Sequence, residues 1–494
     1  MDLTVLFFLT SGLFLGWSLG ANDAANVFGT AVGTRMVRFT TAALICSVFV
    51  ILGAVISGAG ASHTLGKLGS INTLAGAFMV ALSSAVTVYI MTKWRLPVST
   101  SQAIVGGIIG WNLFSDSVTD TSTMIKIFAT WVACPLLAGA IAISIFKLTQ
   151  QFQKRVKLHL LRLDAYSRLA LIFAGAFGAY SLGANNIANV MGVFVPVSPF
   201  TDFEVANLFT LSSVQQLFLI GAIAIAVGIF TYSKRVMLTV GQELLPLTPI
   251  AAWVVVIAHS IVLFLFSSQG LEHLLASAGL PTIPLVPVSS SQAVIGAVVG
   301  IGLLRGGREL RWRVLGNISL GWITTPIISA VMCFVALFFL QNVFNQQVYR
   351  AVHYELSSPV LEKLAQLDIA TERLDDLQGK EFNSSVSFLE ALEQKASLTA
   401  VQEQRALYYA EVEDFVIEPE KIDTLDAAWL TPSQITALRE LSGRTFRYKW
   451  RLAGTLAGRS DEWKLKPDSK LNKLYNSEIK KKLDYIYRTF TSNG

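Results

Sequence analysis

Ten long stretches of this chain contain no Asp, Glu, Lys or Arg. A helix needs about 20 apolar residues to cross the hydrocarbon core of a bilayer, and soluble helices rarely reach that length without a charge. The sequence therefore predicts an all-α, polytopic membrane protein. The stretches are Leu3–Asn22, Phe39–Gly66, Leu68–Thr92, Leu96–Ser115, Ile127–Phe146, Leu169–Thr201, Val205–Ser233, Leu244–Leu271, Leu274–Leu304 and Val314–Tyr349.

Charge divides the chain into two parts near Asn345. Residues 1–344 hold 18 Lys and Arg against 10 Asp and Glu, whereas residues 345–494 hold 21 against 23. The second part has helix-favouring stretches with apolar residues at helical spacing. We therefore expect a small soluble α-helical domain over residues 345–494, with no recognisable catalytic motif. Its expected helices are Val360–Leu377, Val386–Val412 and Pro432–Leu441, the last beginning near Ser433 and stopping at Gly443.

The basic residues of the first part lie in short loops between apolar stretches, as in the cytoplasmic loops of membrane proteins. This placement argues against a nucleic-acid partner, despite a pI near 9.1. The loops follow every second stretch, so all of them can be cytoplasmic at once. The N-terminus and the C-terminal domain are then predicted on the outer side of a cell inner (plasma) membrane. The basic loops contain Arg35/Arg38, Lys93/Arg95, residues 147–168, Lys234/Arg235 and residues 305–313.

Two polar motifs each occur twice. Ser18–Val27, which reads SLGANDAANV, recurs 163 positions later as Ser181–Val190, and Pro97–Ala103 recurs 190 positions later as Pro287–Ala293. The order is the same in both halves, so we expect duplicated units at residues 1–167 and 168–344. Each unit has five stretches, so the second must be inverted in the membrane. Inverted repeats with broken helices near the midplane are typical of secondary transporters.

The residue types in these motifs suit ion binding. The Asn and Asp side chains offer hard oxygen atoms to a cation, and Gly20 and Gly183 can free the backbone beside them. Pro97 and Pro287 can open a short helix whose Ser-rich first turn presents N–H groups to an anion. Close helix packing by small residues is the alternative for the first motif, and hydroxyl bonding to the preceding helical turn is the alternative for the second.

Asp23 is the one acid in the four motifs. A carboxylate at membrane depth is costly and usually functional. The sequence contains no GxSxG, HExxH or Walker A motif, so we predict a transporter rather than an enzyme and see no sign of ATP driving. His63, His259 and His273 have no second ligand at metal spacing, which favours packing or loop roles for them.

At these four motifs the chain resembles the inorganic phosphate transporter (PiT) family of Na⁺- or H⁺-coupled phosphate symporters. The stretch Arg235–Gly241 followed by Leu247–Pro249 is also similar to that family's second repeat. The resemblance covers about residues 1–344. It implies two inverted-topology repeats whose motif-bearing broken helices or hairpins converge on phosphate, and it implies a homodimer.

The resemblance also implies site residues. The coupling ion, Na⁺, would be bound by Asp23, Asn26, Asn186 and Asn189. No metal beyond Na⁺ and no cofactor beyond the coupling ion is implied. The anion would be bound by Ser99, Thr100, Ser101, Gln102, Ser289, Ser290, Ser291, Gln292, Asn22 and Asn185.

The chain departs from the family pattern at two positions. Asn186 stands where the family commonly has Asp, and Val50 stands where many members have Glu. Both departures remove a negative charge. The leading hypothesis is Na⁺-coupled phosphate import by alternating access, with arsenate as a possible competitor. A sulfate permease, an H⁺-coupled phosphate carrier and a phosphate-sensing receptor-like protein stay open as alternatives.

Overall fold

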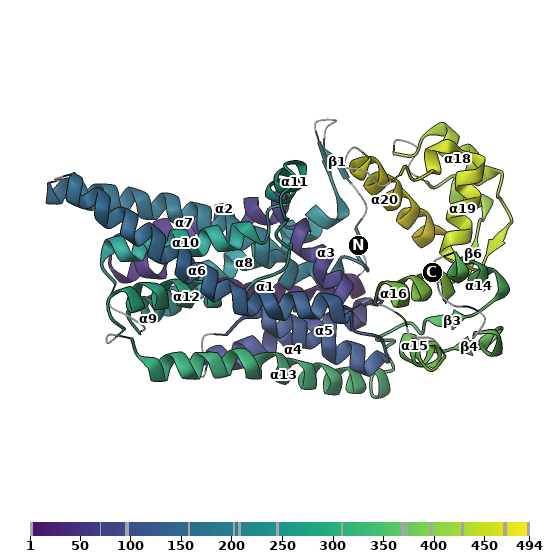
Figure 1. Cartoon of the computed structure of the whole chain (residues 1–494), viewed down its shortest axis with the longest axis horizontal. Coiled ribbons are helices and arrows are strands. Elements are labelled where there is room, and N and C mark those ends of the chain that lie inside the picture. The colour runs from purple at the N-terminus through teal and green to yellow at the C-terminus, as the bar shows by residue number, and fades with distance from the viewer. Residues whose placement is uncertain are drawn as a thin grey trace. The chain divides into compact units, whose positions relative to one another are not determined.

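The computed structural model has two compact units, Met1–Arg350 and Ala351–Gly494 (Figure 1). They are described separately below as unit 1 and unit 2. The structure describes residues 3–69, 71–93, 98–156, 159–200, 203–205, 209–243, 247–307, 310–366, 371, 374–395, 398, 400–425, 429–467 and 472–491. Arg95 and Pro97, which the sequence analysis singles out, lie outside these ranges.

Unit 1 is built almost entirely of helices. Its helices are α1 (Leu3–Gly33), α2 (Phe39–Ser57), α3 (Ala59–Leu68), α4 (Leu74–Lys93), α5 (Thr100–Ser115), α6 (Thr121–Arg155), α7 (Leu160–Met191), η1 (Gly192–Phe194), α8 (Ser213–Thr231), α9 (Ser233–Glu243), α10 (Pro249–Leu265), α11 (Gln269–Ser277), α12 (Ser290–Leu304) and α13 (Trp312–Asn342). A short antiparallel pair, β1 (Phe203–Val205) with β2 (Phe209–Leu211), precedes α8.

Seven described helices are long and apolar enough to cross a membrane, and α10 with α11 passes the same test only as a pair bent by 69°, which is the geometry of a broken span or of a re-entrant loop. The chain is therefore a multi-pass membrane protein. The other two predicted stretches are not continuous helices. Val98 and Ser99 precede α5 and residues 278–289 precede α12 as non-helical backbone, so α5 and α12 have only 16 and 15 residues.

The two halves of unit 1 pack against each other in matched pairs. Helix α1 packs on α8 while α7 packs on α2, and α5 packs on α13 while α12 packs on α6. Each pair becomes the other when the halves are exchanged, as two inverted repeats require. In Figure 1, α13 can be followed along α4 and α5, which belong to the other half.

Glycines bring the paired backbones into contact. A Cβ at Gly20 of α1 would overlap the carbonyl oxygen of Ile225 in α8, and one at Gly183 of α7 would overlap that of Val50 in α2. Small residues permit this approach in membrane proteins. The expectation that Gly20 and Gly183 free the backbone beside the Asn-rich motifs is wrong. Helices α1 and α7 run through both motifs without a break, because these glycines serve helix contact instead.

The second matched pair of interfaces uses the same device. A Cβ at Gly106 of α5 would overlap the carbonyl oxygen of Pro326 in α13, and one at Gly296 of α12 would overlap that of Pro135 in α6. Pro135 and Pro326 lie inside long helices, where a proline has no N–H to donate to the carbonyl four residues earlier.

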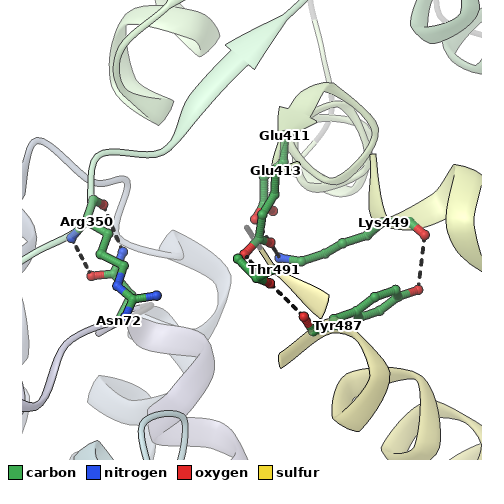
Figure 2. Close-up of polar contacts among 7 residues, drawn as sticks. All are labelled: Asn72, Arg350, Glu411, Glu413, Lys449, Tyr487 and Thr491. Atoms are coloured by element: carbon green, nitrogen blue, oxygen red, sulfur yellow. Dashed lines mark hydrogen bonds and ion pairs between the residues drawn. The ribbon is translucent and has the colours of Figure 1, made fainter. Parts of the chain in front are cut away.

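The backbone that follows α13 is held by the first half of unit 1. The Asn72 side chain donates to Arg350 O at 3.0 Å and accepts from Arg350 N at 2.9 Å, as Figure 2 shows. Val348 O accepts from Thr73 Oγ1 at 2.7 Å and from Trp111 Nε1 at 3.1 Å. These four bonds fix the end of unit 1 onto the segment before α4 and onto α5.

Unit 2 mixes short helices with short strands. Its helices are α14 (Ser358–Ala365), η3 (Asp375–Leu377), α15 (Ser385–Glu393), α16 (Ala400–Ala410), α17 (Pro419–Ile422), α18 (Pro432–Arg439), α19 (Lys449–Arg459), η4 (Asp461–Trp463) and α20 (Lys473–Phe490). Its strands are β3 (His353–Glu355), β4 (Glu381–Phe382), β5 (Glu411–Val412), β6 (Phe415–Val416) and β7 (Thr445–Phe446), arranged as the antiparallel sheets β4-β3-β5 and β6-β7.

A half-buried ion cluster ties three segments of unit 2 together. Lys449 Nζ lies 2.7 Å from Glu411 Oε1 and 2.8 Å from Glu413 Oε2 (Figure 2). Tyr487 donates to Lys449 O at 3.2 Å, and Thr491 Oγ1 donates to Tyr487 O at 2.6 Å. Burial alone lowers the pKa of the Lys449 ammonium, but the two carboxylates outweigh it and hold that pKa above its ordinary value.

The predicted helices of this unit are partly right. The stretches Val360–Leu377 and Val386–Val412 each contain helix, but neither is one continuous helix, and the second ends in β5. Helix α18 begins at Pro432 rather than at Ser433, because Thr431 and Gln434 form a capping box there. Gly443, with φ of +77°, lies just beyond its end, which suits a residue without a Cβ.

The glycine contacts predict how unit 1 responds to a single methyl group. We expect Gly296→Ala to lower the free energy of unfolding by about 1–3 kcal/mol, because α12 and α6 would have to separate. Gly316→Ala on α13 is the matched control, since no described residue other than its own neighbours in α13 has an atom within 4 Å of the added Cβ. Thermal unfolding in detergent measures both variants. Equal unfolding temperatures for the two would contradict the backbone contact.

Candidate functional site

The two Ser-rich motifs form the starts of two short helices. Ser99 is the N-cap of α5 and accepts from Gln102 N at 3.3 Å, and Ser289 is the N-cap of α12 and accepts from Gln292 N at 3.2 Å. The first N–H groups of a helix have no partner inside the helix, and each cap occupies one of them. The remaining N–H groups, with the positive end of each helix dipole, can bind an anion.

Asparagine side chains anchor the non-helical backbone before each short helix. Asn22 of α1 donates to Val98 O at 3.3 Å. Asn185 of α7 donates to Val286 O at 3.2 Å and accepts from Val288 N at 2.9 Å. The first Asn of each duplicated motif therefore holds the segment that leads into α5 or α12.

The two helix starts are also bonded to each other. Ser101 of α5 donates to Val288 O at 2.9 Å, and Ser291 of α12 donates to Val98 O at 3.4 Å. Each serine thus bonds the backbone that precedes the opposite helix. These reciprocal bonds place the two helix starts next to one another.

The remaining amides reach the hydroxyls of the helix starts. Asn189 Nδ2 donates to Ser101 Oγ and to Asn186 Oδ1, both at 2.8 Å. Asn26 Nδ2 donates to Ser290 Oγ at 3.0 Å. The structure therefore brings the second and third polar residues of each Asn motif to the helix starts.

Asp23 is the acid of this cluster. Its Oδ2 accepts from Thr100 Oγ1 at 3.2 Å, and its Oδ1 accepts from Asn22 Nδ2 at 3.0 Å. The side chain is only 2% exposed. A buried carboxylate with two neutral donors is undercompensated, so it is suited to bind a cation.

The predicted site residues therefore gather in one place, where Asn26 is partly exposed and the others are buried. None of them is Lys or Arg. Four of their polar atoms have no partner among the described residues, namely Gln102 Oε1, Gln292 Oε1, Asn186 Nδ2 and Asn189 Oδ1. Unpaired buried polar atoms are rare in folded proteins and are consistent with a ligand site. Which residues bind the anion and which bind the cation stays a prediction.

Sequence reasoning missed one neighbour of the site. His259 of α10 is fully buried, and its Nε2 lies 2.9 Å from Ser290 Oγ. An ordinary packing role was expected because no second metal ligand stands at a suitable spacing. The available signal was the position of an imidazole in the middle of an apolar stretch.

Comparison with known proteins agrees with this geometry. The model of the phosphate transporter family matches residues 19–333, with a second match over residues 274–399. A protein of Methanocaldococcus jannaschii assigned as a phosphate permease is 25% identical over 336 residues, which is 68% of this chain and 97% of that protein. A protein of Haemophilus influenzae with the same assignment is 25% identical and covers 68% of this chain and 96% of its own length.

A solved structure shares the fold. It is called the sodium-dependent phosphate transporter, superposes with a TM-score of 0.54 at 24% identity, and covers 69% of this chain and 99% of its own.

The anchoring role of Asn185 gives a test of the site's architecture. We expect Asn185→Leu to speed hydrogen–deuterium exchange over residues 284–289 by about tenfold, because Val288 N loses its buried acceptor and each lost bond is worth about 1 kcal/mol. Asn342→Leu is the matched control, since the Asn342 side chain is exposed and its one hydrogen bond among the described residues is to Phe338 O of its own helix. Exchange that is unchanged in Asn185→Leu would show that this side chain does not hold the segment.

Proposed function

Because this chain belongs to the phosphate transporter family, we propose that it imports inorganic phosphate together with Na⁺ by alternating access. The observation that carries the proposal is the meeting of the α5 and α12 starts beside the Asn and Asp side chains of α1 and α7. Family membership comes from the match over residues 19–333.

The charges of the cluster support a co-bound cation. Phosphate at neutral pH is an anion, Asp23 is an acid, and no Lys or Arg is among the predicted site residues. Helix starts and hydroxyls offset part of the negative charge, and a cation held by hard oxygen atoms would offset the rest. The sodium-dependent phosphate transporter of the same fold is in line with Na⁺ as that cation.

The unpaired atoms favour phosphate over sulfate. Gln102 Oε1 and Gln292 Oε1 are buried oxygen atoms that lack a donor among the described residues. Phosphate near neutral pH keeps at least one P–O–H group and can donate a hydrogen bond, whereas sulfate cannot. A buried acceptor left unpaired costs free energy, so these oxygen atoms select the anion that carries a proton.

Separate ion gradients in proteoliposomes test this proposal. We expect uptake of labelled phosphate to require an inward Na⁺ gradient and to be inhibited by arsenate more than by sulfate. A pH gradient alone that drives equal uptake would mean H⁺ coupling instead. Uptake of sulfate without phosphate would mean a sulfate permease, and phosphate binding without any uptake would favour a sensor.

We expect Asp23→Asn to reduce Na⁺-driven phosphate uptake at least tenfold, because the only acid among the site residues is lost. Asp116→Asn is the matched control. Asp116 is exposed and has φ of +53°, a conformation that Asn also tolerates. Na⁺-dependence that persists unchanged in Asp23→Asn would exclude this carboxylate from ion coupling.

We also propose that the N-terminus and unit 2 both lie on the outer side of a plasma membrane. The proposal rests on the Lys and Arg residues in the loops of unit 1, which favour the cytoplasmic side. The natural cysteines Cys46, Cys134 and Cys333 are buried, so one introduced cysteine can be labelled selectively. An impermeant maleimide should label Ser442→Cys in intact cells but label Lys234→Cys only after permeabilisation. The reverse pattern would place unit 2 inside. A homodimer stays a prediction from the resemblance.

A further inference from the structure

The hydroxyl of Ser290 lies between two side chains from different helices. Asn26 Nδ2 of α1 donates to Ser290 Oγ at 3.0 Å, and His259 Nε2 of α10 lies 2.9 Å from the same oxygen. Ser290 is the first residue of α12. His259 therefore touches the site through one hydroxyl.

The other half of unit 1 has a different partner at the corresponding hydroxyl. Thr100 precedes Ser290 by the 190 residues that separate the two copies of the motif. Its hydroxyl bonds Asp23 Oδ2. Asn186, the counterpart of Asp23, instead accepts from Asn189 Nδ2, and its Oδ1 lies 3.5 Å from Ser101 Oγ. Each helix start thus has one hydroxyl bound to an ionisable side chain, which is a carboxylate in one half and an imidazole in the other.

The hydrogen-bond partners of His259 determine which ring nitrogen carries the proton. A neutral imidazole has one N–H donor and one acceptor nitrogen. Nδ1 is buried and has no partner among the described residues, so a proton there would be an unpaired buried donor. A proton on Nε2 is paired with Ser290 Oγ. Nδ1 lacks a described partner in either tautomer, and a buried N–H donor is left unpaired more rarely than a buried acceptor, which favours the Nε2–H tautomer.

This tautomer controls the Ser290 hydroxyl. A hydroxyl has two acceptor positions and one proton. Asn26 and the Nε2–H group together fill both acceptor positions, so the Ser290 proton is not needed by either neighbour and can be donated elsewhere. With an unprotonated Nε2, the same proton would instead be donated to His259.

We infer that His259 is a positioning residue for the anion: its Nε2–H group donates to Ser290 Oγ and leaves the Ser290 O–H free to donate to an anion at the start of α12. This inference rests on the proposed function. The second half then offers a free hydroxyl donor to the anion, whereas in the first half the Thr100 hydroxyl donates to Asp23. The oxyanion that fits is one with an unprotonated oxygen facing α12, such as inorganic phosphate.

Variants at position 259 separate this role from simple packing. His259→Gln keeps an N–H donor near the position of Nε2, whereas His259→Leu keeps only the bulk. We expect His259→Leu to raise the KM for phosphate in proteoliposomes roughly tenfold, as for one lost hydrogen bond to an ion, with maximal uptake within about twofold. His259→Gln should stay within about threefold of the natural protein in KM. His273→Gln, at an exposed histidine of α11, should change neither value.

A double-variant cycle with Ser290→Ala tests whether His259 acts through that hydroxyl. In the Ser290→Ala background, His259→Leu should raise KM no further. Equal losses in His259→Gln and His259→Leu, or effects that multiply with Ser290→Ala, would overturn the inference.

The inference and the proposed function fail in different ways. If the natural protein takes up no phosphate, the proposed function fails, and the dissociation constant of inorganic phosphate in detergent with Na⁺ becomes the readout for the same variants. A His259→Leu variant that binds or transports phosphate like the natural protein would refute the role of His259 alone. A natural protein that does neither would refute both.

Discussion

Non-helical backbone inside an apolar protein must find its hydrogen-bond partners within the chain. Water and lipid cannot supply them in the core of a membrane. In unit 1 the segments before α5 and α12 are non-helical and need such partners. Side chains of α1, α5, α7 and α12 form hydrogen bonds with their backbone. Asn185 takes both a donor and an acceptor role toward one segment, and Ser101 and Ser291 bond the two segments reciprocally. The polar motifs are therefore needed for the fold as well as for any ion.

The same bonds make the site common to both halves. The start of α5 belongs to the first half, yet its Ser101 bonds Val288 and Asn189 of the second. The start of α12 is in turn bonded by Asn26 of the first half. Neither half contains a complete set of partners. A relative motion of the halves would change the site and the helix contacts together, which is the kind of coupling that alternating access needs.

Duplication in the sequence carried most of the predictable information about the site. Residue type and the two offsets predicted motifs suited to ion binding, and the resemblance to the family predicted that these motifs converge. The sequence could not show whether Gly20 packs against α8 or breaks helix α1. Glycine is the residue that suits both roles. His259 was missed for a related reason: its partner Ser290 is 31 residues away, and no periodic pattern connects them.

In unit 2 the sequence predicted helices but not strands. Strands of two or three residues, such as β5 at Glu411–Val412, are too short to show an alternating pattern. The sequence does contain the signal for the capping box, because Gln434 stands three positions after Thr431, whereas Thr436 stands three positions after Ser433.

The crossed pairing of helices also has a consequence for synthesis. Helices α2 and α6 pack mainly on α7, α8, α10 and α12, and α13 packs on α4 and α5. When only helices α1 to α6 have been made, Gly20 and Gly106 therefore lie in the membrane without the helices that they contact, α8 and α13. The first half therefore lacks these packing partners until the second half, which ends with α13 at Asn342, has been made. A stall or truncation within the second half would leave the first half without its main packing surfaces.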